Sequence, residues 1–119
     1  PKDANLWYLL GLGQIENNDE PGALESFNEA LKIEPSFIRA LFNRALLNEK
    51  VGRLEQALQD LENCSSLDKE NADIPFTLAV LYRNGRYRDA AAAAAEALRR
   101  DPGHAQARQI LESASRHGR

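Results

Sequence analysis

The sequence predicts an all-α protein, an α-solenoid of about seven helices that pack as antiparallel pairs. The chain of 119 residues is rich in alanine and leucine and poor in β-branched residues, a composition that favours helices. Its apolar segments have helical length and alternate with turns that contain proline, glycine or asparagine. Pro35 and Pro102 stand 67 residues apart. This separation is close to two steps of about 34 residues, a period typical of helical repeat arrays.

The first predicted helix pair covers residues 5–17 and 21–33. The first segment is apolar on nearly every side, which is typical of a buried helix. The second segment has apolar residues on one side only, at helical spacing: Ala23, Leu24, Phe27, Ala30 and Leu31. Pro21 suits a first helical turn, Pro35 ends the pair, and Ser36 is the expected N-cap of the next helix.

Two further pairs and a final helix follow. The second pair is predicted at 37–51 and 54–67, with Gly52 as a left-handed residue in the turn. The third pair is predicted at 72–84 and 87–99, with a turn at Gly85. The last segment, 104–116, is amphipathic, and we expect it to cover the open end of the array.

Small residues are expected where the helices of a pair approach closely. Gly11, Ala45 and Ala79 occupy these positions in the first helix of each pair. Larger residues should fill the remaining space between the helices: Trp7, Leu10, Phe27, Leu61 and Leu78.

Several function classes find no support in the sequence. A net charge of −3 does not predict nucleic-acid binding, and the longest apolar run, residues 6–12, is too short for direct membrane insertion. Cys64 is the only cysteine and is expected to be a small buried residue. His104 and His117 have no accompanying ligand set and are expected on the surface. We therefore predict no metal site, no cofactor and no enzymatic activity.

The chain resembles the tetratricopeptide repeat (TPR) family, whose 34-residue motif is W-x2-L-G-x2-Y, then A-x3-F-x2-A, then P. The first repeat carries Trp7, Leu10, Gly11, Ala23, Phe27, Ala30 and Pro35, with Gln14 at the tyrosine position. The second keeps Leu41, Ala45, Gly52, Leu54, Ala57 and Leu61, with Arg44 and Lys69 off the pattern. The third keeps Leu78, Ala79, Tyr82, Gly85, Tyr87, Ala90, Ala97 and Pro102, with Pro75 at the tryptophan position.

The resemblance covers the whole chain and implies a right-handed α-solenoid that forms one domain, residues 1–119. Its repeats would span about 4–37, 38–71 and 72–104, followed by a capping helix at about 105–117. It also places a concave, peptide-binding groove on the first helix of each pair. The matching residues are Tyr8, Leu12, Arg39, Phe42, Asn43, Leu46, Phe76, Thr77, Val80 and Arg83.

The expected ligand of this groove is a peptide or an amphipathic helix of a partner protein. Tyr8, Phe42 and Phe76 recur at steps of 34 residues, and an exposed apolar strip often marks an interaction site. The alternative interpretation is that these aromatic residues belong to the core. The alternative functions are those of an appendage of a larger enzyme, of a secretion or assembly component, or of a homo-oligomer formed through the first helix.

Some TPR domains bind the carboxylate-rich C-terminus of heat-shock chaperones through lysine, arginine and asparagine. Only Asn43 fits that pattern, because Tyr8, Leu12, Asp73 and Thr77 replace the residues that would hold the carboxylates. Without the cationic donors, charge-assisted recognition is lost, so this ligand is not expected.

The sequence is also expected to be a fragment of a longer array. Pro1 lies 34 residues before Pro35, and the first helix lacks the polar outer face of a terminal repeat. The preference for arginine over lysine, together with the alanine content, favours a bacterial source with GC-rich DNA.

Overall fold

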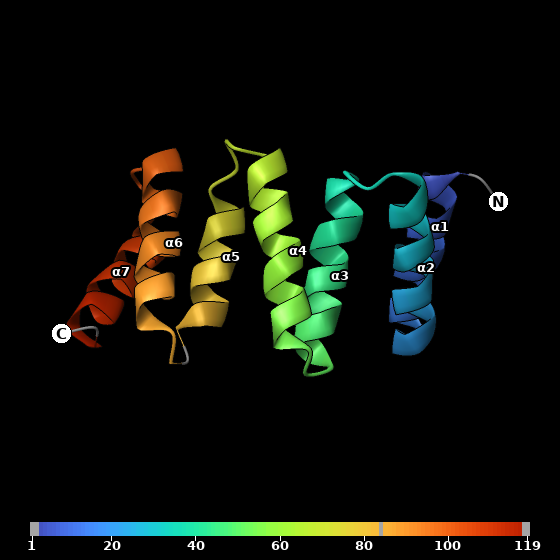
Figure 1. The fold of residues 1–119 in the computed structure, drawn as a ribbon, viewed down its shortest axis with the longest axis horizontal. Helices are drawn as coiled ribbons and strands as arrows, with labels where there is room; N and C mark the ends of the chain where they lie inside the picture. The colour runs from blue at the N-terminus through green and yellow to red at the C-terminus, as the bar shows by residue number, and fades with distance from the viewer. Residues whose placement is uncertain (1–2, 84, 118–119) are drawn as a thin grey trace. The chain divides into compact units, whose positions relative to one another are not determined.

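The computed structural model describes residues 3–83 and 85–117, and these residues confirm the all-α prediction. They form seven α-helices, which follow one another along the chain as antiparallel pairs (Figure 1): α1 (Ala4–Glu16), α2 (Glu20–Ile33), α3 (Ile38–Lys50), α4 (Leu54–Leu67), α5 (Asp73–Tyr82), α6 (Tyr87–Arg100) and α7 (Ala105–His117). The chain divides into two compact units, Pro1–Asp60 and Leu61–Arg119, with the division inside α4. Each unit is described by itself.

In unit 1, α2 packs against both α1 and α3 (Figure 1). Ala23, Phe27 and Ala30 of α2 are completely buried. A Cβ atom placed on Gly11 would lie 2.6 Å from Cε1 of Phe27. The predicted close approach at Gly11 is thus confirmed, because only a residue without a side chain leaves room for the Phe27 ring.

The expectation that α1 is buried on every side is wrong for unit 1. Its buried residues, Ala4, Tyr8 and Gly11, lie on a single face. On another face, Leu6, Leu9 and Leu10 are 54%, 52% and 49% exposed. Leu10, which we expected to point inward, therefore belongs to an exposed apolar face of this helix.

The helix ends follow the predicted turns with one correction. Gly52 and Gly85 have φ angles of +88° and +117°, in the left-handed region that favours glycine. Ser36 is not the N-cap of α3, since Phe37 takes that position without a side-chain hydrogen bond. The predicted helix over 72–84 ends at Tyr82, and residue 84 lies outside the described residues.

Arg44, which departs from the family pattern, forms a buried ion pair in unit 1. Its Nε and Nη2 atoms donate to the two carboxylate oxygens of Asp60, at 2.8 and 2.7 Å, and its Nη1 donates to Asn28 at 2.8 Å. Asp60 is buried, so this bidentate pair supplies the counter-charge that a buried carboxylate requires. Arg44 thus ties α2, α3 and the beginning of α4 together.

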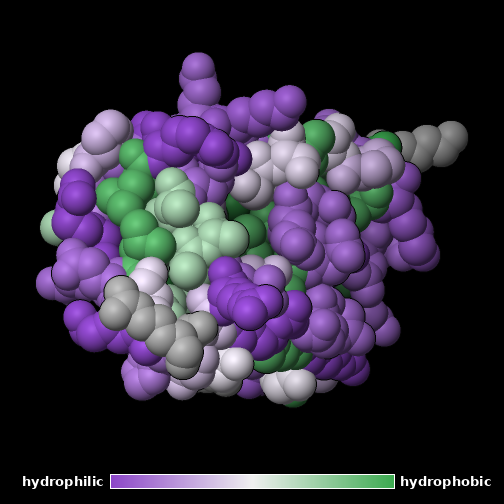
Figure 2. All heavy atoms as spheres, turned by 60° about the vertical axis from the view of Figure 1, so that its left-hand side comes forward, coloured by the Kyte–Doolittle hydropathy of each residue, from purple (hydrophilic) through white to green (hydrophobic). Residues whose placement is uncertain are grey.

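In unit 2, α6 packs against both α5 and α7. Ala90, Ala94 and Ala97 of α6 are completely buried, as is Cys64, which confirms the prediction for the cysteine. The alanine run keeps the helices close because it places no large side chain between them. Figure 2, which brings the C-terminal side of the chain forward, shows its broadest group of hydrophobic residues on that side, bordered by hydrophilic residues.

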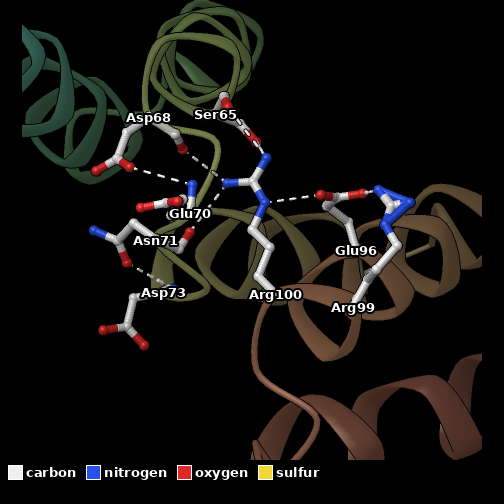
Figure 3. Close-up of polar contacts among 8 residues, drawn as sticks. All are labelled: Ser65, Asp68, Glu70, Asn71, Asp73, Glu96, Arg99 and Arg100. Atoms are coloured by element: carbon white, nitrogen blue, oxygen red, sulfur yellow. Dashed lines mark hydrogen bonds and ion pairs between the residues drawn. The ribbon is translucent and has the colours of Figure 1, made fainter.

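Arg100, the last residue of α6, bonds to the end of α4 and to the loop that follows it (Figure 3). Its guanidinium donates to the backbone oxygens of Ser65, Asp68 and Asn71 at 2.9–3.1 Å, and to Glu96 at 2.7 Å. The side chain is only 8% exposed. A cation at a helix C-terminus satisfies carbonyl groups that have no partner within the helix. Arg100 is therefore a structural residue.

We expect opposite effects from two glycine substitutions in α1. Gly11→Ala should lower the free energy of unfolding by about 1–3 kcal/mol, because the new methyl group collides with Phe27. Gly13→Ala should raise it by about 0.5–1 kcal/mol, since nothing beyond its chain neighbours and its own helix backbone lies within 4 Å of the added Cβ and alanine favours the helix. Urea denaturation measures both. Equal effects would contradict the helix register described above.

Arg99 and Arg100 provide a matched pair of arginine substitutions. Arg100→Ala should cost about 1–3 kcal/mol of stability, because several part-buried acceptors lose a charged donor. Arg99→Ala should cost less than about 1 kcal/mol, since Arg99 is 72% exposed and its ion pair with Glu96 lies at the surface. Thermal denaturation of the two variants would refute the structural role of Arg100 if their melting temperatures were equal.

Candidate binding surfaces

The predicted polar residues of unit 1, Arg39 and Asn43, both contact the Tyr8 side chain. The Asn43 Nδ2 atom donates to the Tyr8 hydroxyl at 3.4 Å and to the backbone oxygen of Arg39 at 2.8 Å. The Arg39 guanidinium lies over the ring of Tyr8, 5.2 Å from its centroid, and also faces the Phe37 ring at 5.4 Å. Three of the predicted groove residues are thus brought together at one place.

Tyr8 itself is a core residue, which corrects the prediction of an exposed aromatic group. Its ring packs between Phe37 and Phe27, with centroid distances of 5.1 and 6.0 Å. These partners come from α2 and from the start of α3, and neither contact could be derived from the repeat spacing alone. Its hydroxyl group accepts from Asn43, and the Arg39 guanidinium lies over its ring.

The apolar groove residues of unit 1 are partly accessible. Leu12 and Phe42 are half-buried, and Leu46 is 42% exposed. Phe42 and Leu46 lie one turn apart on α3, so they share a face of that helix. Arg39, four residues before Asn43, is exposed on the same helix. This face of α3 combines apolar surface with a cation and an amide.

In unit 2 the four predicted residues lie on α5 or directly after it. Phe76 and Val80 are half-buried, and Phe76 packs against the ring of His104 with a centroid distance of 4.7 Å. Thr77 donates its hydroxyl proton to the backbone oxygen of Asp73 at 2.8 Å. Arg83 is exposed, and its guanidinium has no hydrogen-bond or ion-pair partner among the described residues.

A pocket of about 460 Å³ lies between α5 and α7 in unit 2. It is lined by Phe76, Arg83, Tyr87, Gln106, Gln109, Ile110, Ser113, Ala114 and His117. Sequence reasoning found only Phe76 and Arg83, because it treated α7 as a cap. The available signal was a polar series on α7, Gln106, Gln109 and Ser113, whose spacing of three and four residues places them on one helix face.

One of the two histidines, His104, differs from the expectation of surface residues. The His104 side chain is only 9% exposed and lies 3.5 Å from the Asp73 carboxylate. Its Nδ1 accepts a hydrogen bond from the Ala107 backbone amide at 3.2 Å and so caps α7. His117 is exposed, yet its ring stacks on Tyr87 with a centroid distance of 4.7 Å.

Tyr82 of α5 is an ionisable group that serves a structural contact. Burial raises the pKa of Tyr82, and the nearby Glu62 carboxylate raises it further. The hydroxyl of Tyr82 donates to Glu62 at 3.4 Å. In residues 3–83 and 85–117, no group of three or more His, Cys, Asp or Glu side chains is placed to hold a metal ion. None of the helices described there has the length and hydrophobicity that a membrane crossing requires.

Comparison with known proteins identifies the family. Two sequence profiles described as tetratricopeptide repeat match residues 38–71 and 80–111, which together make up more than half of the chain. With the seven helices described above, these matches show that the chain belongs to the tetratricopeptide repeat family.

The similar proteins are either longer than this chain or less than a quarter identical to it in sequence. The peroxisomal targeting signal receptor of Kluyveromyces lactis is 30% identical over 84 residues, which are 71% of this chain and 15% of the receptor. The crystal structure of MamA superimposes with a TM-score of 0.88 at 19% identity, over 99% of this chain and 70% of that one. The type III secretion chaperone SycD of Yersinia enterocolitica, solved with a peptide of the translocator YopD, gives a TM-score of 0.83 at 14% identity, over 97% of this chain and 94% of that one. Both structural likenesses concern the fold.

Proposed function

We propose that this chain is a protein-interaction scaffold that binds a peptide or an amphipathic helix of a partner protein. The observation that carries the proposal is the accessible apolar surface on the first helix of a pair in each unit. In unit 1 this surface is Phe42 and Leu46 of α3, and in unit 2 it is Phe76 and Val80 of α5. Polar side chains that can fix a ligand stand beside both surfaces.

The relatives support an interaction role. One is a receptor for a targeting signal, and another was crystallised with a peptide of its translocator. The chain spans 15% of the receptor's length, so the activity of a whole protein that contains such repeats extends beyond them. The ligand proposed here is not the carboxylate-rich chaperone tail, because Asp73 is an acid and Thr77 bonds to its own helix backbone.

Peptide selection tests this function. A library of random twelve-residue peptides displayed on their mRNA is selected against the immobilised chain and, in parallel, against the double variant Phe42→Glu/Phe76→Glu. We expect enrichment with the original chain and loss of enrichment with the variant, since a carboxylate disfavours apolar contact. Equal enrichment on both proteins would remove these surfaces from the binding site.

A stability control separates the loss of binding from unfolding. Phe42→Ala should lower stability much less than Phe27→Ala, because Phe42 is half-buried whereas Phe27 is completely buried. Loss of a fully packed phenylalanine side chain costs about 3–5 kcal/mol. Urea denaturation of both variants measures the difference, and equal losses would show that Phe42 is a core residue.

Self-association is the second candidate function, and the exposed face of α1 favours it. Leu6, Leu9 and Leu10 lie within one turn of each other and are all about half exposed. A second copy of the chain could cover them, as in repeat proteins that assemble or that form part of a larger component. Sedimentation velocity should show dimers that Leu6→Glu/Leu10→Glu abolishes and that Val51→Glu, at an exposed turn, leaves intact. A monomer at every protein concentration would exclude this candidate.

A further inference from the structure

We propose that the α5–α7 pocket of unit 2 binds an extended peptide segment in which an acidic side chain stands next to an apolar one. This inference rests on the proposed function and names the class of ligand for one of its surfaces. It depends on three properties of the pocket: a cation without a partner among the described residues, an apolar base, and two amide groups and a hydroxyl that make no hydrogen bond to those residues.

The charge of the pocket calls for an anion. Arg83 is exposed at the pocket and has no partner among the described residues, and no carboxylate belongs to the lining. Three other arginines of unit 2 are already engaged. Arg86 pairs with Asp89 at 3.0 Å, Arg108 donates to the backbone oxygen of Pro102 at 2.9 Å, and Arg100 is bonded internally. Arg83 is therefore the cation that this pocket offers to a carboxylate.

The base of the pocket favours an apolar side chain. Ile110 and Ala114 of α7 are buried, and the half-buried Phe76 and Tyr87 supply aromatic surface beside them. The Phe76 ring is held by His104 and the Tyr87 ring by His117, each at a centroid distance of 4.7 Å. Aromatic rings that are already packed lose little side-chain entropy when a ligand binds.

The polar side of the pocket favours an extended backbone over a helix. Gln106, Gln109 and Ser113 line it from α7 and make no hydrogen bond to other described residues. Each glutamine offers two donor protons and a carbonyl acceptor. An extended peptide presents backbone N–H and C=O groups that need such partners, whereas the backbone groups within a helix already bond to one another. The free amides are therefore matched to an extended ligand.

Parallel selections test this inference against the proposed function. The same twelve-residue mRNA-displayed library is selected on the original chain, on Arg83→Glu and on Arg88→Glu. Arg88 is the matched control, an exposed arginine of α6 outside the pocket lining. We expect the peptides enriched on the original chain and on Arg88→Glu to share an acidic residue beside an apolar one. On Arg83→Glu the acidic residue should be replaced by lysine or arginine.

Fluorescence anisotropy with the most enriched peptide measures the individual contacts. We expect Arg83→Gln to weaken binding about tenfold and Gln109→Leu to weaken it several-fold, with Arg88→Gln unchanged. The segment that the enriched peptides share should tolerate proline at one or more positions, because proline suits an extended backbone but breaks a helix. Circular dichroism confirms that each variant keeps its fold.

The outcomes distinguish failure of the inference from failure of the function. Enriched peptides that lack the acidic residue, that keep it on Arg83→Glu, or that bind as helices intolerant of proline would overturn the inference and leave the scaffold function standing. Absence of any enriched peptide on the original chain would overturn the scaffold function and this inference with it.

Discussion

The close approach of neighbouring helices is the constraint on which the structure of each unit depends. In unit 1 the Phe27 ring occupies the space that a side chain on Gly11 would need. In unit 2 the small buried alanines of α6 allow this helix to pack closely against both α5 and α7. Close packing fixes the rotation of a helix about its axis, and the rotation decides which residues remain accessible. The accessible faces of α3 and α5 thus follow from residues on their opposite sides.

Local patterns predicted the helices well because their signals lie within a few residues. Apolar periodicity gave every helix to within about two residues at each end, and Gly52 and Gly85 marked turns whose φ angles require glycine. Contacts between residues far apart in the sequence were missed, because such contacts leave no signal within a few residues of either partner. The Arg44–Asp60 pair, the bonds of Arg100 to the end of α4 and the contact of His104 with Asp73 join side chains to partners that no spacing rule identifies.

The candidate surfaces show the same limit. The family resemblance indicated ten residues, of which nine are at least partly accessible, and Tyr8 is buried because Phe27 and Phe37 enclose its ring. The contribution of α7 was not predicted, because a capping helix needs a polar outer face in any case. A polar residue on α7 therefore carries no information about binding until the structure shows whether it faces solvent or lines a pocket with Phe76 and Arg83.

The arginines of this chain divide into two groups with different physical roles. Arg44 and Arg100 are largely buried and bonded to several acceptors, so their electrostatic energy stabilises the fold. Arg83 is exposed, and solvent and salt screen its interaction with any ligand. Such a cation contributes more to the choice of ligand and to the rate of association than to affinity. Affinity at this pocket must then come chiefly from the apolar contacts with Phe76, Tyr87 and Ile110. Added salt should weaken the preference for an acidic ligand and should leave these apolar contacts nearly unchanged.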